Sequence, residues 1–234
     1  MKSLALALLV FAACGVNSDA DNDFPVVPQG GGSTGGGTSS QTIRGRVCLV
    51  TDPRFLATCA TTGADGLLVS IGNSTATTIA NGTFVMPQPT AGMTSMVSVT
   101  GSGIVPATTQ LNANAQIPVI NQALFDMMVL QTGIVTTHGS GSILATISRR
   151  GEPVANITAV ATPAPAFGPF FDGTTPTGFT VNPTGAQGVV FFSGAPVNTP
   201  VSVTFTDPAT QTETTVGGVQ VIDGGITFVE GNLP

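Results

Sequence analysis

The chain has 234 residues, with 12 acidic side chains against 6 Lys or Arg and a single His, so its formal net charge is −6 at pH 7. Such an acidic chain offers no basic patch for a phosphate backbone, which excludes nucleic acid as the expected partner. Only 8% of the residues are charged, and 30 Gly and 17 Pro accompany abundant Thr, Val, Ala and Ser, a composition typical of β-sheet with many turns.

The first 13 residues have the pattern of an export signal. Met1-Lys2-Ser3 carries a positive charge, and the ten residues from Leu4 to Ala13 are all apolar. A membrane-spanning helix needs about 20 apolar residues, whereas the core of a signal peptide needs about 7 to 15. We therefore expect residues 1–13 to be a signal peptide.

A cysteine stands directly after this apolar run. Phe11-Ala12-Ala13-Cys14 resembles the bacterial lipobox, although Phe11 departs from the usual Leu. The resemblance implies that Cys14 receives lipid, with palmitate among the acyl groups, and becomes the first residue of the mature protein. It also implies a protein that is anchored to the bacterial cell envelope. The expected membrane is the outer membrane, with the protein on its periplasmic face or on its surface face. The alternative is a plain secreted protein with a coincidental cysteine.

The composition of the segment after Cys14 predicts a flexible tether. Residues 15–41 combine three Asp with two Pro and the run GGGSTGGGTSS, and they hold too little apolar surface to offset the entropy of ordering. As a Gly/Ser-rich coil the segment would span roughly 30 Å. We expect it to hold the folded part away from the membrane.

Folded structure is predicted from residue 42 onward. In TIRGRVCLV, Val47 and Leu49 alternate with Arg46 and Cys48, the period of a half-buried strand, so Cys48 is expected to point away from the core. Further strands with alternating apolar residues follow in GLLVSIG, NGTFVMP and SMVSVTG. The spacing of turn residues between them is typical of a β-sandwich.

Two cysteines remain once Cys14 is assigned to lipid. Cys48 and Cys59 would meet an oxidising environment in an exported protein, so we expect a disulfide between them. A free reactive thiol and a metal ligand are the alternatives. A metal site would need further His or Cys nearby, and we infer no metal and no cofactor.

Short strand motifs of the first half of the sequence recur in the second half. Val97-Ser98-Val99-Thr100 recurs as Val201-Ser202-Val203-Thr204, and other strand motifs recur in the same order at a similar offset. Between the halves, NQALFDMMVLQTG has apolar residues at helical spacing, Asn121 as a possible N-cap and Gly133 as a possible terminator. We predict one short helix over Asn121 to Thr132.

The order of these motifs resembles a known family. Gly45-x-Val47, DGLLVSIGN, NGTFVMPQPTAG and VSVTGSGIVPATTQL, followed by RRGEPVANITAVAT in the second half, are similar to carboxypeptidase regulatory-like domains. The resemblance implies an all-β fold of two tandem antiparallel β-sandwich domains, transthyretin-like or Ig-like, joined by one short helix. The expected parts are a signal peptide at 1–13, a lipidated cysteine and tether at 14–41, domain 1 at 42–120, a helical connector at 121–138 and domain 2 at 139–234.

An enzymatic role is not expected. The single histidine, His138, lies in a Gly/Ser loop without G-x-S-x-G, and the motifs of hydrolases with a transthyretin-like fold are missing. Among the acidic residues, Asp172 is the strongest candidate for a catalytic role, because it follows two Phe. The simpler interpretation is that Asp172 and Gly173 form a turn. No catalytic residue and no small-molecule substrate are inferred.

The remaining interpretations are non-enzymatic. One is a binding or adhesive module with a protein partner in the envelope, and the alternative is a structural spacer or accessory subunit of an envelope assembly. The absence of Trp and Tyr argues against sugar binding. An exposed phenylalanine cluster would favour a partner surface, and inward packing would favour the spacer. The phenylalanines in question are Phe167, Phe170, Phe171, Phe191 and Phe192.

Overall fold

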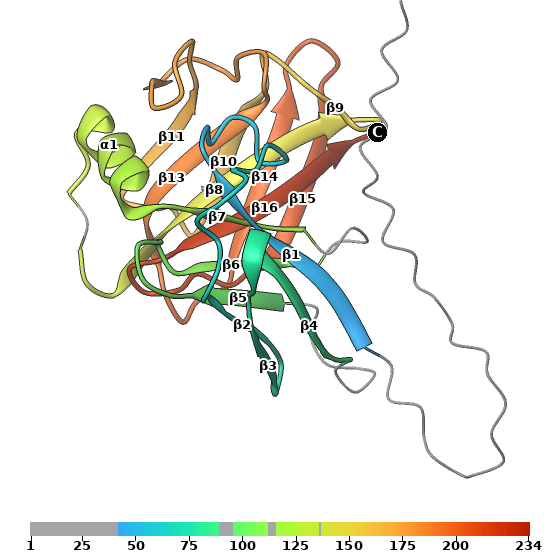
Figure 1. Cartoon of the computed structure of the whole chain (residues 1–234). Helices are drawn as coiled ribbons and strands as arrows, with labels where there is room; N and C mark the ends of the chain where they lie inside the picture. Colours follow the sequence, from blue (N-terminus) through green and yellow to red (C-terminus); the bar gives the residue numbers. More distant parts are fainter. Residues whose placement is uncertain (1–41, 89–95, 112–115, 136) are drawn as a thin grey trace, which may run out of the picture. The chain divides into compact units, whose positions relative to one another are not determined.

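The structure, a computed structural model, describes residues 42–88, 96–111, 116–135 and 137–234, and these are mostly β-strand (Figure 1). The first half contains β1 (Thr42–Val50), β2 (Leu68–Ile71), β3 (Ser74–Thr77), β4 (Thr83–Pro87), β5 (Met96–Thr100), β6 (Ala107–Gln110) and β7 (Gln116–Ile120). The helix α1 (Gln122–Thr132) follows. The second half contains β8 (Ser140–Arg149), β9 (Glu152–Pro153), β10 (Thr158–Thr162), β11 (Phe167–Asp172), β12 (Phe179–Thr180), β13 (Val189–Pro196), β14 (Val201–Asp207), β15 (Thr212–Val219) and β16 (Ile226–Leu233).

The two halves share a strand-pairing pattern. In the first half β1 pairs antiparallel with β4 and parallel with β7, while β5 lies between β2 and β6. In the second half β8 pairs antiparallel with β13 and parallel with β16, while β14 lies between β10 and β15. The sequence repeat therefore corresponds to a repeat of strand connectivity.

One large sheet crosses the boundary between the halves. β16 pairs in parallel with β6 through Ile226–Ala107, Thr227–Thr108 and Phe228–Thr109, which joins ten strands into a single sheet. The all-β expectation is confirmed, but the expectation of purely antiparallel sheets is wrong. The β1–β7, β6–β16 and β8–β16 pairs are parallel, so the sheets are mixed. Alternation of apolar residues sets which face a side chain occupies, and it leaves the direction of the neighbouring strand open.

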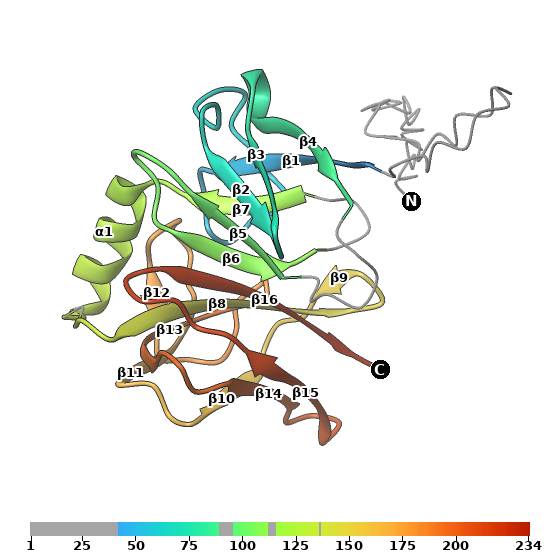
Figure 2. The ribbon, with the colours of Figure 1, turned by 90° about the horizontal axis from the view of Figure 1, so that it is seen from below.

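Two hydrophobic cores lie on opposite faces of this sheet. Figure 2 shows the strands that cover these faces, with β1, β4 and β7 on one side of the large sheet and β10, β14 and β15 on the other. The first core fills the space between β4-β1-β7 and the β2-β5-β6 part of the large sheet, and it extends over the back of β8, β13 and β16. The second core lies between β8-β13-β16 and the small sheet β10-β14-β15. Adjacent residues of β13 show the division, because Phe191 belongs to the first core and Phe192 to the second. Strands buried on both faces require nearly continuous apolar runs, as in VVFF of β13.

The helix α1 forms where the sequence predicts it. The Asn121 side chain accepts a hydrogen bond from the backbone N–H of Leu124, and Gly133 ends the helix in the left-handed conformation with φ of 67°. Leu124, Phe125 and Met128 are buried in the first core, where Phe125 meets Phe191 edge to face. The helix therefore covers the back of the second half's sheet.

Residues 42–234 lie within one compact unit. The strand β14, which carries Val201 and Val203, pairs only with β10 and β15 of its own half, as two separate sandwiches would require. The first core nevertheless includes side chains from both halves. The division into domains at 42–120 and 139–234 stays a prediction.

Candidate binding groove

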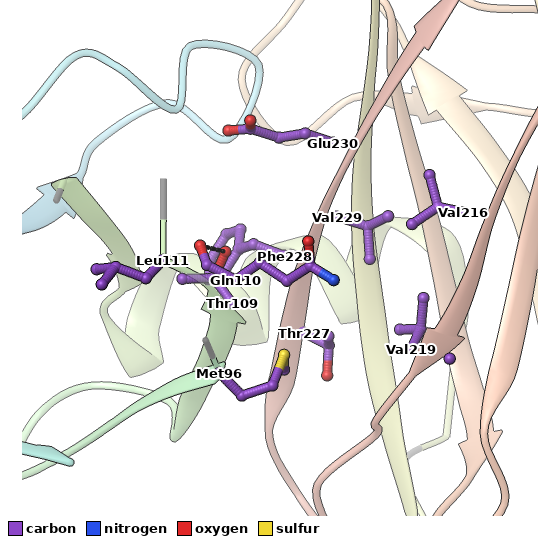
Figure 3. A pocket seen from close by; sticks show the side chains of 11 residues that line it. Met96, Thr109, Gln110, Leu111, Val216, Val219, Thr227, Phe228, Val229 and Glu230 are labelled. Atoms are coloured by element: carbon purple, nitrogen blue, oxygen red, sulfur yellow. Dashed lines mark hydrogen bonds between the residues drawn. The ribbon is translucent and has the colours of Figure 1, made fainter. Parts of the chain in front are cut away.

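A groove with a cavity volume of about 200 Å³ lies where the two halves meet (Figure 3). Four strands supply its lining: β5 and the end of β6 from the first half, and β15 and β16 from the second. We call it the seam groove. Its lining residues are Met96, Thr109, Gln110, Leu111, Val216, Gly218, Val219, Thr227, Phe228, Val229 and Glu230.

The pairing of β6 with β16 creates this groove. β6 and β5 continue the large sheet beyond the point where the small sheet β10-β14-β15 ends, and β15 is the strand of the small sheet that lines the groove. The sheet therefore forms one wall and β15 the other (Figure 3). No sequence motif marks the site, because its residues come from four strands spread over more than a hundred positions.

The lining is mainly apolar, with a few polar groups. The hydroxyl of Thr227 donates to the carbonyl of Gln220 at 2.8 Å, and the hydroxyl of Thr109 donates to the carbonyl of Gln110 at 3.4 Å. Glu230 is exposed and is the single charged side chain of the lining. Such a surface can bind a ligand by apolar contact, with hydrogen bonds to fix its orientation.

The predicted disulfide between Cys48 and Cys59 is present, with 4.9 Å between the Cα atoms. The expected orientation of Cys48 is wrong: its exposed fraction is 0%, and it belongs to the first core. The chain after β1 turns back so that Cys59 forms a β-bridge with Val50, and this return covers the face that strand alternation alone assigns to solvent. The disulfide thus closes a loop over residues 49–58.

This loop reaches the second half of the molecule. The guanidinium of Arg54 is 2.7 Å from the Asp52 carboxylate and donates from Nη1 to the carbonyl of Gly173 at 3.2 Å. Burial acts to raise the pKa of Asp52, but the hydrogen bonds and charge of Arg54 outweigh it, so this pKa lies below its usual value. The hydrogen bonds that the Arg54 side chain donates to the Asp52 carboxylate likewise raise the pKa of Arg54.

Asp172 is buried and serves as a structural anchor. Its carboxylate accepts hydrogen bonds from the backbone N–H groups of Gly185, Gln187 and Val189 at 2.9, 3.0 and 2.9 Å. These bonds tie the end of β11 to the loop that leads into β13. The interpretation of Asp172 as a simple Asp-Gly turn residue misses these contacts, because they come from residues 13 to 17 positions away.

The phenylalanine cluster packs inward. Phe171, Phe191 and Phe192 are buried, whereas Phe167 and Phe170 are half-buried against the first core. These side chains therefore form no contiguous exposed patch.

The other residues singled out from the sequence lie apart from the groove. His138 is exposed in the loop before β8. Cys14 and the tether lie outside the described residues. The described residues hold no group of three or more His, Cys, Asp or Glu side chains placed to share a metal ion. In the same part of the chain, no helix has the length and apolar character needed to cross a bilayer.

Comparison with known proteins finds no matching family model, no matching curated protein and no matching solved structure.

Proposed function

We propose that this chain is a non-enzymatic lipoprotein of the bacterial cell envelope whose folded part is a binding module. In this proposal Cys14 carries the lipid, residues 15–41 form the tether, and the seam groove receives a protein partner. The observation that carries the binding role is the groove itself, a mainly apolar surface with hydroxyl, amide and carboxylate groups where the two halves meet.

We further propose that the two halves are tandem β-sandwiches of the transthyretin type, as the resemblance to carboxypeptidase regulatory-like domains implies. The proposal is supported by the recurrence of one pairing pattern, in which the first strand of each half lies antiparallel to one neighbour and parallel to the other. In this arrangement, both sandwiches contribute strands to the groove.

Membrane fractionation tests the anchor. We expect the Cys14→Ser protein to leave the membrane fraction, because a protein without its lipid has no anchor there. The Cys48→Ala/Cys59→Ala double variant is the matched control and should stay with the membrane. Retention of Cys14→Ser after a high-salt wash would contradict the anchor.

Photo-cross-linking in intact envelopes tests the binding role. A photoreactive amino acid in place of Gln110 lies in the groove, whereas one in place of Thr204 lies on β14, away from it. A discrete cross-linked product from position 110 alone would support the groove as a partner site. Equal products from both positions, or none, would contradict it.

The second candidate function is a structural spacer or accessory subunit of an envelope assembly. The inward packing of Phe171, Phe191 and Phe192 favours it, because these aromatic side chains support the core and leave no aromatic patch for a partner. An absence of cross-linking at position 110, together with membrane retention that depends on Cys14, would favour the spacer.

A further inference from the structure

The two sulfur atoms of the Cys48–Cys59 disulfide lie in different surroundings. Cys48 belongs to β1 and has an exposed fraction of 0% within the first core. Cys59 is half-buried in the chain that returns after β1, and it follows the exposed residues Ala57 and Thr58. A molecule in solution can therefore reach the disulfide of the folded protein only from the Cys59 side.

A polar side chain lies against the Cys59 sulfur. The amide of Gln116, at the start of β7, donates hydrogen bonds to Sγ of Cys59 at 3.1 Å and to the carbonyl of Ala57 at 3.2 Å. Such an N–H donor stabilises negative charge on the sulfur when the bond is reduced. The Cys48 sulfur lies in an apolar core, where a charged form would lose its hydration. Each sulfur is also 3.7 Å from a backbone carbonyl, so that contact does not distinguish them.

A positive charge lies on the same side of the disulfide. The guanidinium of Arg46 donates from Nη2 to the carbonyl of Ala60, the residue after Cys59, at 3.5 Å. The acidic residue of the closed loop, Asp52, is paired with Arg54 at 2.7 Å. Reactive cysteines are found in partly exposed, electropositive surroundings, and inert ones are buried. By these criteria Cys59 is the reactive member of the pair.

We propose that Cys59 is the residue through which this protein exchanges disulfides with an external disulfide oxidant, and that Cys48 closes the bond. In the first step the Cys59 thiolate attacks one sulfur of the oxidant, whose S–S bond breaks and releases a thiolate. In the second step the Cys48 thiolate attacks Sγ of Cys59 and releases the other half of the oxidant. The cysteines lose two electrons and, through solvent, two protons, and the oxidant becomes two thiols.

The same geometry opposes the reverse reaction in the folded protein. A reducing thiolate can reach only Sγ of Cys59, so Cys48 would have to leave as a thiolate inside the first core. The bond is thus formed through an accessible residue and is broken when the closed loop opens. This inference goes beyond the proposed binding function and does not involve the seam groove.

Single-cysteine variants test the assignment. Cys48→Ser keeps the Cys59 thiol and Cys59→Ser keeps the Cys48 thiol, and both also carry Cys14→Ser so that each chain has one cysteine. We expect glutathione disulfide to modify the Cys48→Ser protein about 10-fold faster or more, as followed by mass spectrometry. In urea the two rates should become equal. Faster modification of the Cys59→Ser protein in native buffer would overturn the proposal, as would equal rates for two variants that are folded.

The unaltered protein gives a second test, which does not depend on the folding of a variant. We expect excess glutathione to reduce the disulfide about 100-fold more slowly in native buffer than in urea, because only the opened chain exposes Cys48. Trypsin cleaves after Arg54 and so places the two cysteines on separate peptides, 47–54 and 55–149. A glutathione adduct on the peptide with Cys48, or reduction as fast in buffer as in urea, would contradict the proposal.

A variant of Gln116 tests its part as a positioning residue. Gln116→Met keeps the size of the side chain and removes the N–H donor. In the chain with Cys59 as its single cysteine, it should slow modification about 2- to 10-fold, the effect of one hydrogen bond. Gln122→Met, at the exposed start of α1, is the matched control and should leave the rate unchanged. In urea both should react like the parent chain. Equal rates for the two variants in native buffer would refute the role of this hydrogen bond.

Discussion

The two halves of the described chain repeat one pairing pattern but close their cores differently. The second core takes all of its buried side chains from residues 143–233. The first core combines first-half residues with five residues of the second half, together with the buried face of α1. The five are Leu144, Val189, Phe191, Ile226 and Phe228. A repeated topology therefore does not produce two equivalent units, because the first half depends on its neighbour for part of its interior.

Substitution of the adjacent residues Phe191 and Phe192 tests this asymmetry with the largest expected loss of stability. Each is fully buried, so each change to Ala should lower the free energy of unfolding by about 3–5 kcal/mol. Phe191→Ala should also lower amide hydrogen-exchange protection in both halves, because Phe191 packs in the shared core. Phe192→Ala should act mainly on the second half. The same exchange pattern in both variants would refute the asymmetry.

Loss of the disulfide should act on the first half. The Cys48→Ala/Cys59→Ala variant should lose about 3 kcal/mol of stability in urea unfolding, because a closed loop of this length restricts the unfolded chain by about that amount. Reductant added to the unaltered protein should reproduce the effect. An unchanged urea midpoint in both experiments would show that the closed loop adds nothing.

Asp172→Asn should act on the second half, with an expected loss of about 2 kcal/mol. An amide offers one acceptor oxygen in place of two charged ones, and three backbone N–H groups depend on them. Thermal unfolding measures the loss. The isosteric change keeps the volume, so a stability equal to that of the unaltered protein would mean that the carboxylate charge is unimportant there.

The smallest effect concerns acid stability. A hydrogen bond from Arg149, with a further one from the backbone N–H of Ala209, lowers the pKa of Asp207 to about 2. Since an unfolded Asp has a pKa of about 3.9, this contribution is present above that pH and is lost as the pH falls toward 2. Asp207→Asn should flatten the fall of Tm over this range, whereas Asp65→Asn should not. Parallel Tm curves for all three proteins would contradict the assignment.

Sequence patterns were most informative where the signal is local. The helix follows from the Asn121 cap, the apolar spacing and Gly133, all within a few turns of chain. The buried faces of β2 and β14 follow from strict alternation in short segments. These features are determined by residues that are close together in the sequence, so the sequence pattern alone predicts them.

Features that join distant segments were not predictable in the same way. Alternation gave Cys48 an outward direction, but the covering loop and Cys59 bury it. The seam groove exists because β6 meets β16, and neither strand carries a signal for that pairing. The anchoring role of Asp172 likewise depends on a loop that returns to it from later in the chain.

The β6–β16 pairing also bears on how this protein reaches its folded state. It joins residues about 120 positions apart, and chains rich in such non-local strand pairs fold in milliseconds to seconds. Until β16 arrives, both β6 and β8 present an unpaired edge to other chains. Because β16 is the last strand described, the large sheet closes only when this segment has been synthesised. Its insertion joins β6 to β8 and removes both of these unpaired edges, at which the nascent chain is prone to aggregate.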